Sequence, residues 1–197
     1  MRDKATTSAL LVEEGIILRG LMQWDSEELY NLVRSNYQYL AEWLPWVPSV
    51  KSQTDSSSFI RHQQEQMQNQ NEITYGIFVQ GRLSGCIATH TIDWGNKKTS
   101  IGYWIGEEYS GKKLMQKCSK KFIEHLFEEV RLNRIEIRCA ENNIPSRKIA
   151  EKLLMRREGL LKESEWIKDR YIDHIVYGLT KREYRMQGRN PSVAAFF

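Results

Sequence analysis

Cysteine and histidine are scarce in this sequence, and their spacing argues against two kinds of site. There are three cysteines and four histidines in 197 residues. The cysteines are odd in number, far apart and without C-x-x-C spacing or a neighbouring histidine cluster, which argues against a disulfide scaffold and a zinc site. We expect Cys86, Cys118 and Cys139 to be reduced core residues and no metal to be bound. The nearby Lys117 and Lys121 leave a reactive Cys118 as the alternative.

Long apolar runs and a large excess of one charge are also missing. No stretch approaches the run of about 18 apolar residues that a membrane-spanning helix needs, and residues 1–11 lack the apolar core of a signal peptide. Lysine and arginine number 29 against 25 aspartates and glutamates, and the formal net charge of +4 is too small to attract nucleic acid or a membrane by itself. The sequence therefore favours a cytoplasmic protein with neither a nucleic-acid nor a membrane partner.

The remaining composition is that of one globular domain. Apolar residues make up 41% and charged residues 27% of the chain, which is too apolar for a disordered protein, and the length suits a single domain. No repeat or internal linker is evident. We expect residues 1–184 to form the domain and residues 185–197 a C-terminal tail, whose apolar end at 194–197 is either frayed or docked on a partner chain.

Hydrophobic periodicity predicts an α+β order of elements. Strands are expected at 16–20, 73–80, 83–93, 99–105, 135–139, 160–167 and 171–179, and helices from residues 25, 55 and 146 and over 114–130. The strands between 73 and 105 form an antiparallel meander, whereas 135–139 lies parallel to 99–105 across a helical crossover. Asp25 and Glu28 are spaced for a capping box, and Gly159 would end the helix that Ser146 begins.

The start of the helix at residue 114 carries an unusual pair of cations. Lys112 and Lys113 stand where the helix macrodipole disfavours positive charge by about 0.3–1 kcal/mol each. An anion bound to the first-turn amides would resolve this conflict, and Gly111 would let the main chain approach a bulky ligand closely. The segment favours a phosphate-bearing ligand, with a solvated basic pair as the alternative.

Six short motifs follow one another along the chain. They are WLPW at 43–46, IGYWI at 101–105, EEYSGKKLM at 107–115, LNRIEIRCA at 132–140, NIPS at 143–146 and DHIVY at 173–177. In this order they resemble the GNAT acyltransferases, and within them the Rim-type branch that acetylates the N-termini of ribosomal proteins. The resemblance implies an α+β fold with a mixed, mostly antiparallel sheet that splays between its fourth and fifth strands and is flanked by helices.

The resemblance also implies how acetyl-coenzyme A (acetyl-CoA), the cosubstrate, would be held. Free backbone groups of Tyr103, Trp104 and Ile105 would bond the pantetheine arm in the splayed gap, and Asn143 would contact the cofactor. The diphosphate would be held by the backbone amides of Ser110, Gly111, Lys112, Lys113, Leu114 and Met115.

Two departures from the family pattern weaken this transfer. Of the three loop positions that the family specifies, Glu108, Gly111 and Lys113, only the glycine matches, and the loop can still donate its N–H groups if Lys113 keeps helical dihedrals. The tyrosine that often serves as general acid is replaced by Ala150. A non-catalytic binding module with a degenerate loop is therefore an alternative to an enzyme.

Two residues are candidates for the chemistry. Glu136 falls at the strand position where a related enzyme keeps its proposed general base; the alternative is an outward carboxylate paired with Arg134 or Arg138. Ser146 matches the serine that assists the departing thiolate in the Rim-type branch; the alternative is an ordinary helix N-cap.

Four further residues are candidates for the acceptor cleft. Trp43 and Trp46 flank a proline that breaks any helix, and their indoles either form a wall of the substrate cleft or simply pack. His90 and Asp93 are reserve candidates, for which surface and turn roles are the alternatives.

The resemblance implies an acetyl-CoA-dependent N-acetyltransferase in which a primary amine attacks the thioester directly, without a covalent enzyme intermediate. The expected acceptor is the N-terminal α-amino group of a ribosomal protein, and a small amine such as a polyamine or an aminoglycoside is the alternative. The apolar tail and the resemblance also lead us to expect a homodimer.

Overall fold

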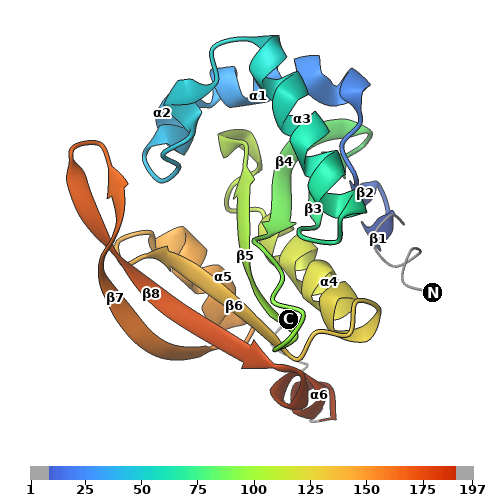
Figure 1. Ribbon diagram of the computed structural model, residues 1–197, viewed down its shortest axis with the longest axis vertical. Coiled ribbons are helices and arrows are strands. Elements are labelled where there is room, and N and C mark those ends of the chain that lie inside the picture. Colours follow the sequence, from blue (N-terminus) through green and yellow to red (C-terminus); the bar gives the residue numbers. More distant parts are fainter. Residues whose placement is uncertain (1–8, 190–197) are drawn as a thin grey trace.

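The computed structural model describes residues 9–189, and the frame of this part of the chain is one eight-stranded sheet (Figure 1). The strands are β1 (Leu10–Glu13), β2 (Ile16–Arg19), β3 (Thr74–Val79), β4 (Arg82–Thr89), β5 (Lys98–Ile105), β6 (Arg134–Ala140), β7 (Arg156–Ile167) and β8 (Arg170–Thr180). Their order across the sheet is β1-β2-β3-β4-β5-β6-β8-β7, and β5 with β6 is the parallel pair among antiparallel neighbours. The predicted mixed, mostly antiparallel sheet is confirmed.

Helices cover both faces of the sheet. They are α1 (Ser26–Ser35), α2 (Tyr37–Ala41), α3 (Gln53–Gln68), α4 (Leu114–Glu128), α5 (Ile144–Lys152) and α6 (Lys181–Arg189), with 3₁₀ turns η1 (Gln23–Asp25), η2 (Val47–Ser49) and η3 (Glu107–Tyr109). One core cluster joins α4 and α5 to the face that we call the back, and a second joins α1 and α3 to the front. The amphipathic spacing of α4, with Cys118, Phe122 and Leu126 fully buried, explains why it lies flat on the back face.

β5 and β6 part from each other halfway along their length. Their pairing runs from Lys98 opposite Arg134 to Ile101 opposite Ile137 and ends there, although β5 stays paired with β4 as far as Ile105. Figure 1 shows the two strands diverging towards α2. We call this opening the fork; it is the splay expected between the fourth and fifth predicted strands.

The capping box expected at Asp25 and Glu28 is wrong. The Asp25 carboxylate instead accepts hydrogen bonds from the Arg19 guanidinium, at 2.7 and 2.9 Å, and from the Met22 amide at 2.7 Å. Glu28 accepts from the backbone amide of Leu83 at 2.9 Å. Both carboxylates bind partners outside α1: Asp25 forms a charge-assisted pair with the partly buried Arg19, and Glu28 accepts from an amide of the sheet.

Several predicted boundaries also move. β1 has no counterpart among the predicted strands, and the strand expected to reach residue 93 ends at 89. α5 begins after Asn143, whose side chain accepts from the Ser146 amide at 3.1 Å, so Ser146 is not the N-cap. Gly159 lies inside β7 and does not end a helix. α6 crosses the expected domain boundary at residue 184, and the apolar end at 194–197 lies outside the described residues.

The three cysteines are buried and free, as predicted. Burial raises the pKa of the Cys86 and Cys118 thiols to about 12, which disfavours the reactive thiolate considered for Cys118. Over residues 9–189 no helix has the length and apolarity needed to cross a bilayer, and no group of histidine, cysteine and acidic side chains is arranged to hold a metal ion.

Candidate active site

The fork exposes backbone groups of β5 that have no strand to pair with. The Gly106 amide donates to the Ser84 carbonyl at 2.8 Å. In an antiparallel pair, alternate residues direct their backbone N–H and C=O groups to the same neighbouring strand. Trp104 therefore directs its backbone groups to β4, whereas Tyr103 and Ile105 direct theirs into the fork. Of the three residues predicted to bond the pantetheine arm, Tyr103 and Ile105 thus face the fork and Trp104 faces β4, and the binding itself stays a prediction.

The loop before α4 adopts a left-handed backbone at two positions. Gly111 has a φ of 75°, and nothing lies within 4 Å of a Cβ built on it. Lys113 has φ 59° and ψ 6°, so the helical dihedrals expected of it are not found. Lys113 is also the N-cap of α4 and forms no side-chain capping bond. The first-turn amides of α4 are therefore left for another acceptor.

One of the predicted diphosphate donors is already used. The Ser110 amide donates to the Glu107 carbonyl at 2.9 Å and closes the 3₁₀ turn η3, so it is not free to bind an anion. In the part of the chain that is described, the amides of Gly111 and Lys112 have no backbone acceptor. The amides of this segment that lack a backbone acceptor thus begin at Gly111 and continue into the first turn of α4.

The start of this loop is tied to the junction of α1 and α2. The Asn36 side chain accepts from the Glu107 amide at 2.8 Å and donates to the Leu32 carbonyl at 2.9 Å. The Tyr39 hydroxyl lies 3.4 Å from the Ser110 hydroxyl. Sequence reasoning missed this link, because the partners are 71 residues apart. A cavity of about 710 Å³ lined by Asn36, Tyr39 and Glu107 lies beside the loop and not in the fork.

Ser146 and Asn143 stand at the start of α5, on the β6 side of the fork. Asn143 caps the helix and so orients its first turn, in which Ser146 is the third residue. The hydroxyl of Tyr103 lies 3.2 Å from the Ser146 hydroxyl and 3.3 Å from the Ser146 carbonyl oxygen. The sequence motif predicted a backbone role for Tyr103 and did not predict this side-chain contact.

The two predicted tryptophans reach the two sides of the fork on the front face. The Trp46 ring lies 5.9 Å from the ring of Trp104 on β5, at a tilt of 58°. Trp43 packs against the cluster formed by Ala140 at the end of β6 and two isoleucines of the β7–β8 hairpin. The packing interpretation of both tryptophans is therefore confirmed, and their role as a wall of the substrate cleft stays a prediction.

Ion pairs join this wall to the tip of the β7–β8 hairpin. The Glu42 carboxylate lies 2.5 Å from the Lys168 ammonium and 3.3 Å from the Arg170 guanidinium. These hydrogen-bonded cations lower the pKa of Glu42, so the pairs persist at neutral pH. The contact spans 126 residues of sequence, and no motif announces it.

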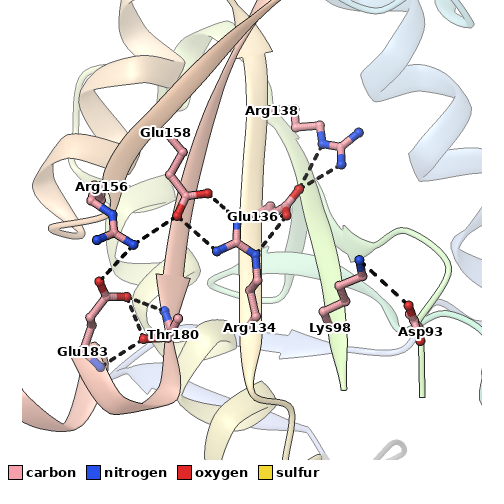
Figure 2. A network of polar contacts seen from close by, with 9 residues as sticks. All are labelled: Asp93, Lys98, Arg134, Glu136, Arg138, Arg156, Glu158, Thr180 and Glu183. Carbon is pink, nitrogen blue, oxygen red and sulfur yellow. Dashed lines mark hydrogen bonds and ion pairs between the residues drawn. The ribbon is translucent and has the colours of Figure 1, made fainter. Parts of the chain in front are cut away.

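Glu136 belongs to an ion-pair network and is not a free base (Figure 2). Arg134 donates to one carboxylate oxygen at 3.0 Å, and Arg138 donates to the other at 2.9 and 3.1 Å. Burial raises the pKa of Glu136, but the hydrogen bonds from Arg138 and Arg134 outweigh it and leave the pKa below its usual value. Arg134 also binds Glu158, which extends the network to β7.

The reserve candidates occupy different places. His90 is exposed, and its Nε2 atom lies 3.2 Å from where a Cβ would stand on Gly102. Asp93 accepts from the backbone and side-chain nitrogens of Asn96 at 2.9 and 2.7 Å and lies 4.0 Å from Lys98. These bonds lower its pKa and hold the β4–β5 turn, so Asp93 has the turn role.

The hairpin supplies an acid–base pair that sequence reasoning missed. The Nε2 atom of His174 lies 3.3 Å from a carboxylate oxygen of Glu165. In the register of β8, His174 stands opposite Ala140, beyond the last residue of β6 that pairs with β5. Only the pairing of β7 with β8 brings the two together, although the histidine lies in a motif used for the family resemblance.

Comparison with known proteins places these features in a family. The model of the acetyltransferase (GNAT) domain matches residues 16–156. The chain belongs to the GNAT acetyltransferases. It is an acetyl-CoA-dependent N-acetyltransferase.

Individual relatives agree over most of the chain. The Bacillus subtilis (strain 168) protein YdaF is 34% identical over 174 residues, which cover 88% of this acetyltransferase and 95% of YdaF. The structure of RimL, a ribosomal L7/L12 α-N-protein acetyltransferase, in complex with coenzyme A has a TM-score of 0.85 at 25% identity and covers 88% of this chain and 98% of RimL. The microcin C7 self-immunity acetyltransferase MccE, in complex with acetyl-CoA and AMP, also has a TM-score of 0.85, at 26% identity over 89% of this chain and 98% of MccE.

The residues present fit acetyl-CoA. No atom lies within 4 Å of a Cβ built on Gly111, which leaves the loop open to a bulky anion. The described residues offer no backbone acceptor to the amides of Gly111 and Lys112, and the first turn of α4 has no side-chain cap. The backbone N–H and C=O groups of Tyr103 and Ile105 that face the fork could pair with the amides of an extended pantetheine arm, as they would with a neighbouring strand. The departures at Glu108 and Lys113 thus change the loop without closing it.

Proposed function

We propose that this acetyltransferase modifies the N-terminal α-amino group of a protein, and that the protein is ribosomal. The observation that carries the proposal is the likeness to RimL, which extends over 88% of this chain and 98% of RimL with a TM-score of 0.85. The predicted homodimer and cytoplasmic location stay predictions.

The state of Glu136 supports an α-amino acceptor over a lysine. A base must be free to accept a proton, and both oxygens of this carboxylate are held by arginines. An α-amino group with a pKa of about 7.7–8.0 is roughly a fifth neutral near pH 7.3, whereas a lysine with a pKa of about 10.4 is neutral only about one part in a thousand. Because the Glu136 carboxylate is not free to serve as a strong base, an acceptor that is already partly neutral suits this site better than a lysine.

The chain's own residues would then act mainly by positioning. Acetyl-CoA supplies the activated acetyl group as a thioester. The loop amides from Gly111 onwards would hold its diphosphate, the inward backbone groups of Tyr103 and Ile105 would align its arm, and the Ser146 hydroxyl would stabilise the departing sulfur. The acceptor amine attacks directly from the front face, beneath Trp43 and Trp46.

His174 is the side chain that we propose to take the proton from the acceptor. It lies beside the end of β6 on the front face, Glu165 holds its imidazole, and histidine is suited to proton transfer near neutral pH. A pH profile of kcat/KM for His174→Gln should lose one limb of the wild-type profile. An unchanged profile would assign the imidazole to the hairpin's structure alone.

A small-molecule amine is the second candidate acceptor. The similarity to MccE, with the same TM-score as RimL, supports it, because that structure holds AMP with acetyl-CoA. A mass-spectrometric assay of acetyl-CoA with N-terminal peptides of ribosomal proteins, beside the same peptides with blocked N-termini and a panel of polyamines and aminoglycosides, separates the two. Acetylation confined to free peptide N-termini supports the proposal, and acetylation of small amines alone refutes it. No thiol release with any amine would indicate a non-catalytic module.

A further inference from the structure

The phenol of Tyr103 links the two sides of the fork. Tyr103 lies on β5 two residues beyond Ile101, the last to pair with β6, and Ser146 lies in the first turn of α5. The Tyr103 hydroxyl is 3.2 Å from the Ser146 hydroxyl and 3.3 Å from the Ser146 carbonyl oxygen. Both side chains are half-buried, so water can compete only in part for these bonds.

We propose that Tyr103 is a positioning residue that directs the hydroxyl hydrogen of Ser146 towards the sulfur of coenzyme A. The inference rests on the proposed function, in which Ser146 stabilises the departing thiolate. The Tyr103 hydroxyl has one hydrogen and two acceptors within reach. When it donates to the Ser146 carbonyl, the Ser146 hydrogen is drawn back to the phenol oxygen; when it donates to the Ser146 hydroxyl, that hydrogen is released to point into the fork.

Rotation about the phenol C–O bond therefore selects between two arrangements of the same three atoms. A thiolate in the fork is a charged acceptor, and hydrogen bonds to charged acceptors are roughly twice as strong as neutral ones. Its arrival favours the second arrangement. No covalent bond is made or broken in this step, and the proton of each hydroxyl stays on its own oxygen.

Tyr103 acts in this way without serving as the acid itself. Burial raises the pKa of its phenol, so the neutral donor form persists through any change at the thiolate. The helix offers no substitute, because Ala150, at the position of the family's usual tyrosine, has no hydroxyl and is fully buried. The sheet thus supplies from β5 a phenol that the helix lacks.

The test measures how strongly the bound coenzyme prefers the thiolate form. Calorimetric titrations with coenzyme A, and with desulfo-coenzyme A as the sulfur-free reference, are run across the pH range in which the thiol ionises. The proteins are wild type, Tyr103→Phe, Ser146→Ala and the double variant. Tyr171→Phe is the matched control, because Tyr171 is 60% exposed at the hairpin tip.

Tyr103→Phe should reduce the preference for thiolate about three- to tenfold, the size of one neutral hydrogen bond. Ser146→Ala should reduce it at least as much, and the double variant should match Ser146→Ala. Desulfo-coenzyme A should bind all variants alike. An equal loss from Tyr103→Phe with and without Ser146, or the same loss in Tyr171→Phe, would overturn the inference.

Turnover gives an independent arm. Tyr103→Phe should lower kcat about three- to tenfold with little change in KM for acetyl-CoA, and should have no further effect once Ser146 is alanine. A wild-type enzyme that acetylates no amine refutes the proposed function, while the coenzyme titrations still decide the role of Tyr103. Thermal melts of every variant show that each is folded.

Discussion

Replacing Lys113 with glycine should stabilise the protein, because the lysine occupies a backbone conformation that glycine adopts freely. Lys113 has φ 59° and ψ 6° at the N-cap of α4. A Cβ in the left-handed region costs about 1–2 kcal/mol, and the greater entropy that glycine loses on folding returns about 0.5–1 kcal/mol of this. Removing a cation from a helix N-terminus contributes about 0.3–1 kcal/mol. The expected net gain is about 1 kcal/mol.

Urea unfolding of the ligand-free protein measures this gain as a higher midpoint at an unchanged slope. The corresponding rise in Tm is about 2–4 °C for a chain of this size. Lys113→Ala is the matched control, since it removes the same charge but keeps the Cβ and hence the strain.

The comparison of the two variants decides the argument. Glycine should exceed alanine in stability by about 0.5–1 kcal/mol after the shared loss of charge. Equal stability of the two variants would show that the left-handed conformation costs no more than the extra entropy that glycine loses on folding. A glycine variant less stable than wild type would refute both parts of the reasoning.

Three further predictions concern the sheet and its carboxylates. A Cβ on Gly85 would lie 2.3 Å from a backbone oxygen of β5, so Gly85→Ala should lower the free energy of unfolding in urea by about 3 kcal/mol. Gly159 has open space around it, so Gly159→Ala should change this free energy little. Similar losses at both sites would contradict the packing argument. Glu136→Gln should keep kcat within about threefold, whereas a true general base would lose about 100-fold or more in the same steady-state assay. Asp25→Asn should cost about 2 kcal/mol at pH 7, because it breaks the pair with Arg19. Burial raises the pKa of Asp25, but the hydrogen bonds from Arg19 and the Met22 amide lower it below 3.8 overall. The stability that the Asp25–Arg19 pair contributes is therefore present above about pH 4 and is lost as the pH falls through the pKa of Asp25 in the folded protein. A pH-independent difference in stability between Asp25→Asn and wild type would refute the assignment.

Local sequence patterns were sufficient for the elements that carry their own periodicity. The meander, the α4 stripe of Cys118, Phe122 and Leu126, and the parallel crossover to β6 all follow from apolar spacing and turn residues. The uncapped start of α4 was also visible in sequence, as a lysine pair behind Gly111. The helix and strand assignments depend mainly on neighbours within a few residues, and the parallel pairing of β5 with β6 follows from the helical crossover between them.

Features that depend on a distant partner were missed or misassigned. The sequence predicts that Asp25 caps a helix, but its carboxylate binds Arg19, because a charged guanidinium is a stronger partner than a neutral helix amide. Ser146 was expected to be an N-cap, but Asn143 caps the helix three residues earlier. A short polar side chain can satisfy several partners, and the motif alone does not say which one it meets.

The sequence by itself determined the order of strands and helices, the family resemblance and the place of the anion-binding loop, because each is written in contiguous residues. Only the tertiary structure decided that Glu136 is held by two arginines, that His174 meets Glu165 and that Tyr103 reaches Ser146 across the fork. Those contacts join separate strands and helices whose relative placement is determined by the packed sheet. A hydrogen bond is sensitive to tenths of an ångström, and spacing along a chain carries no information at that scale.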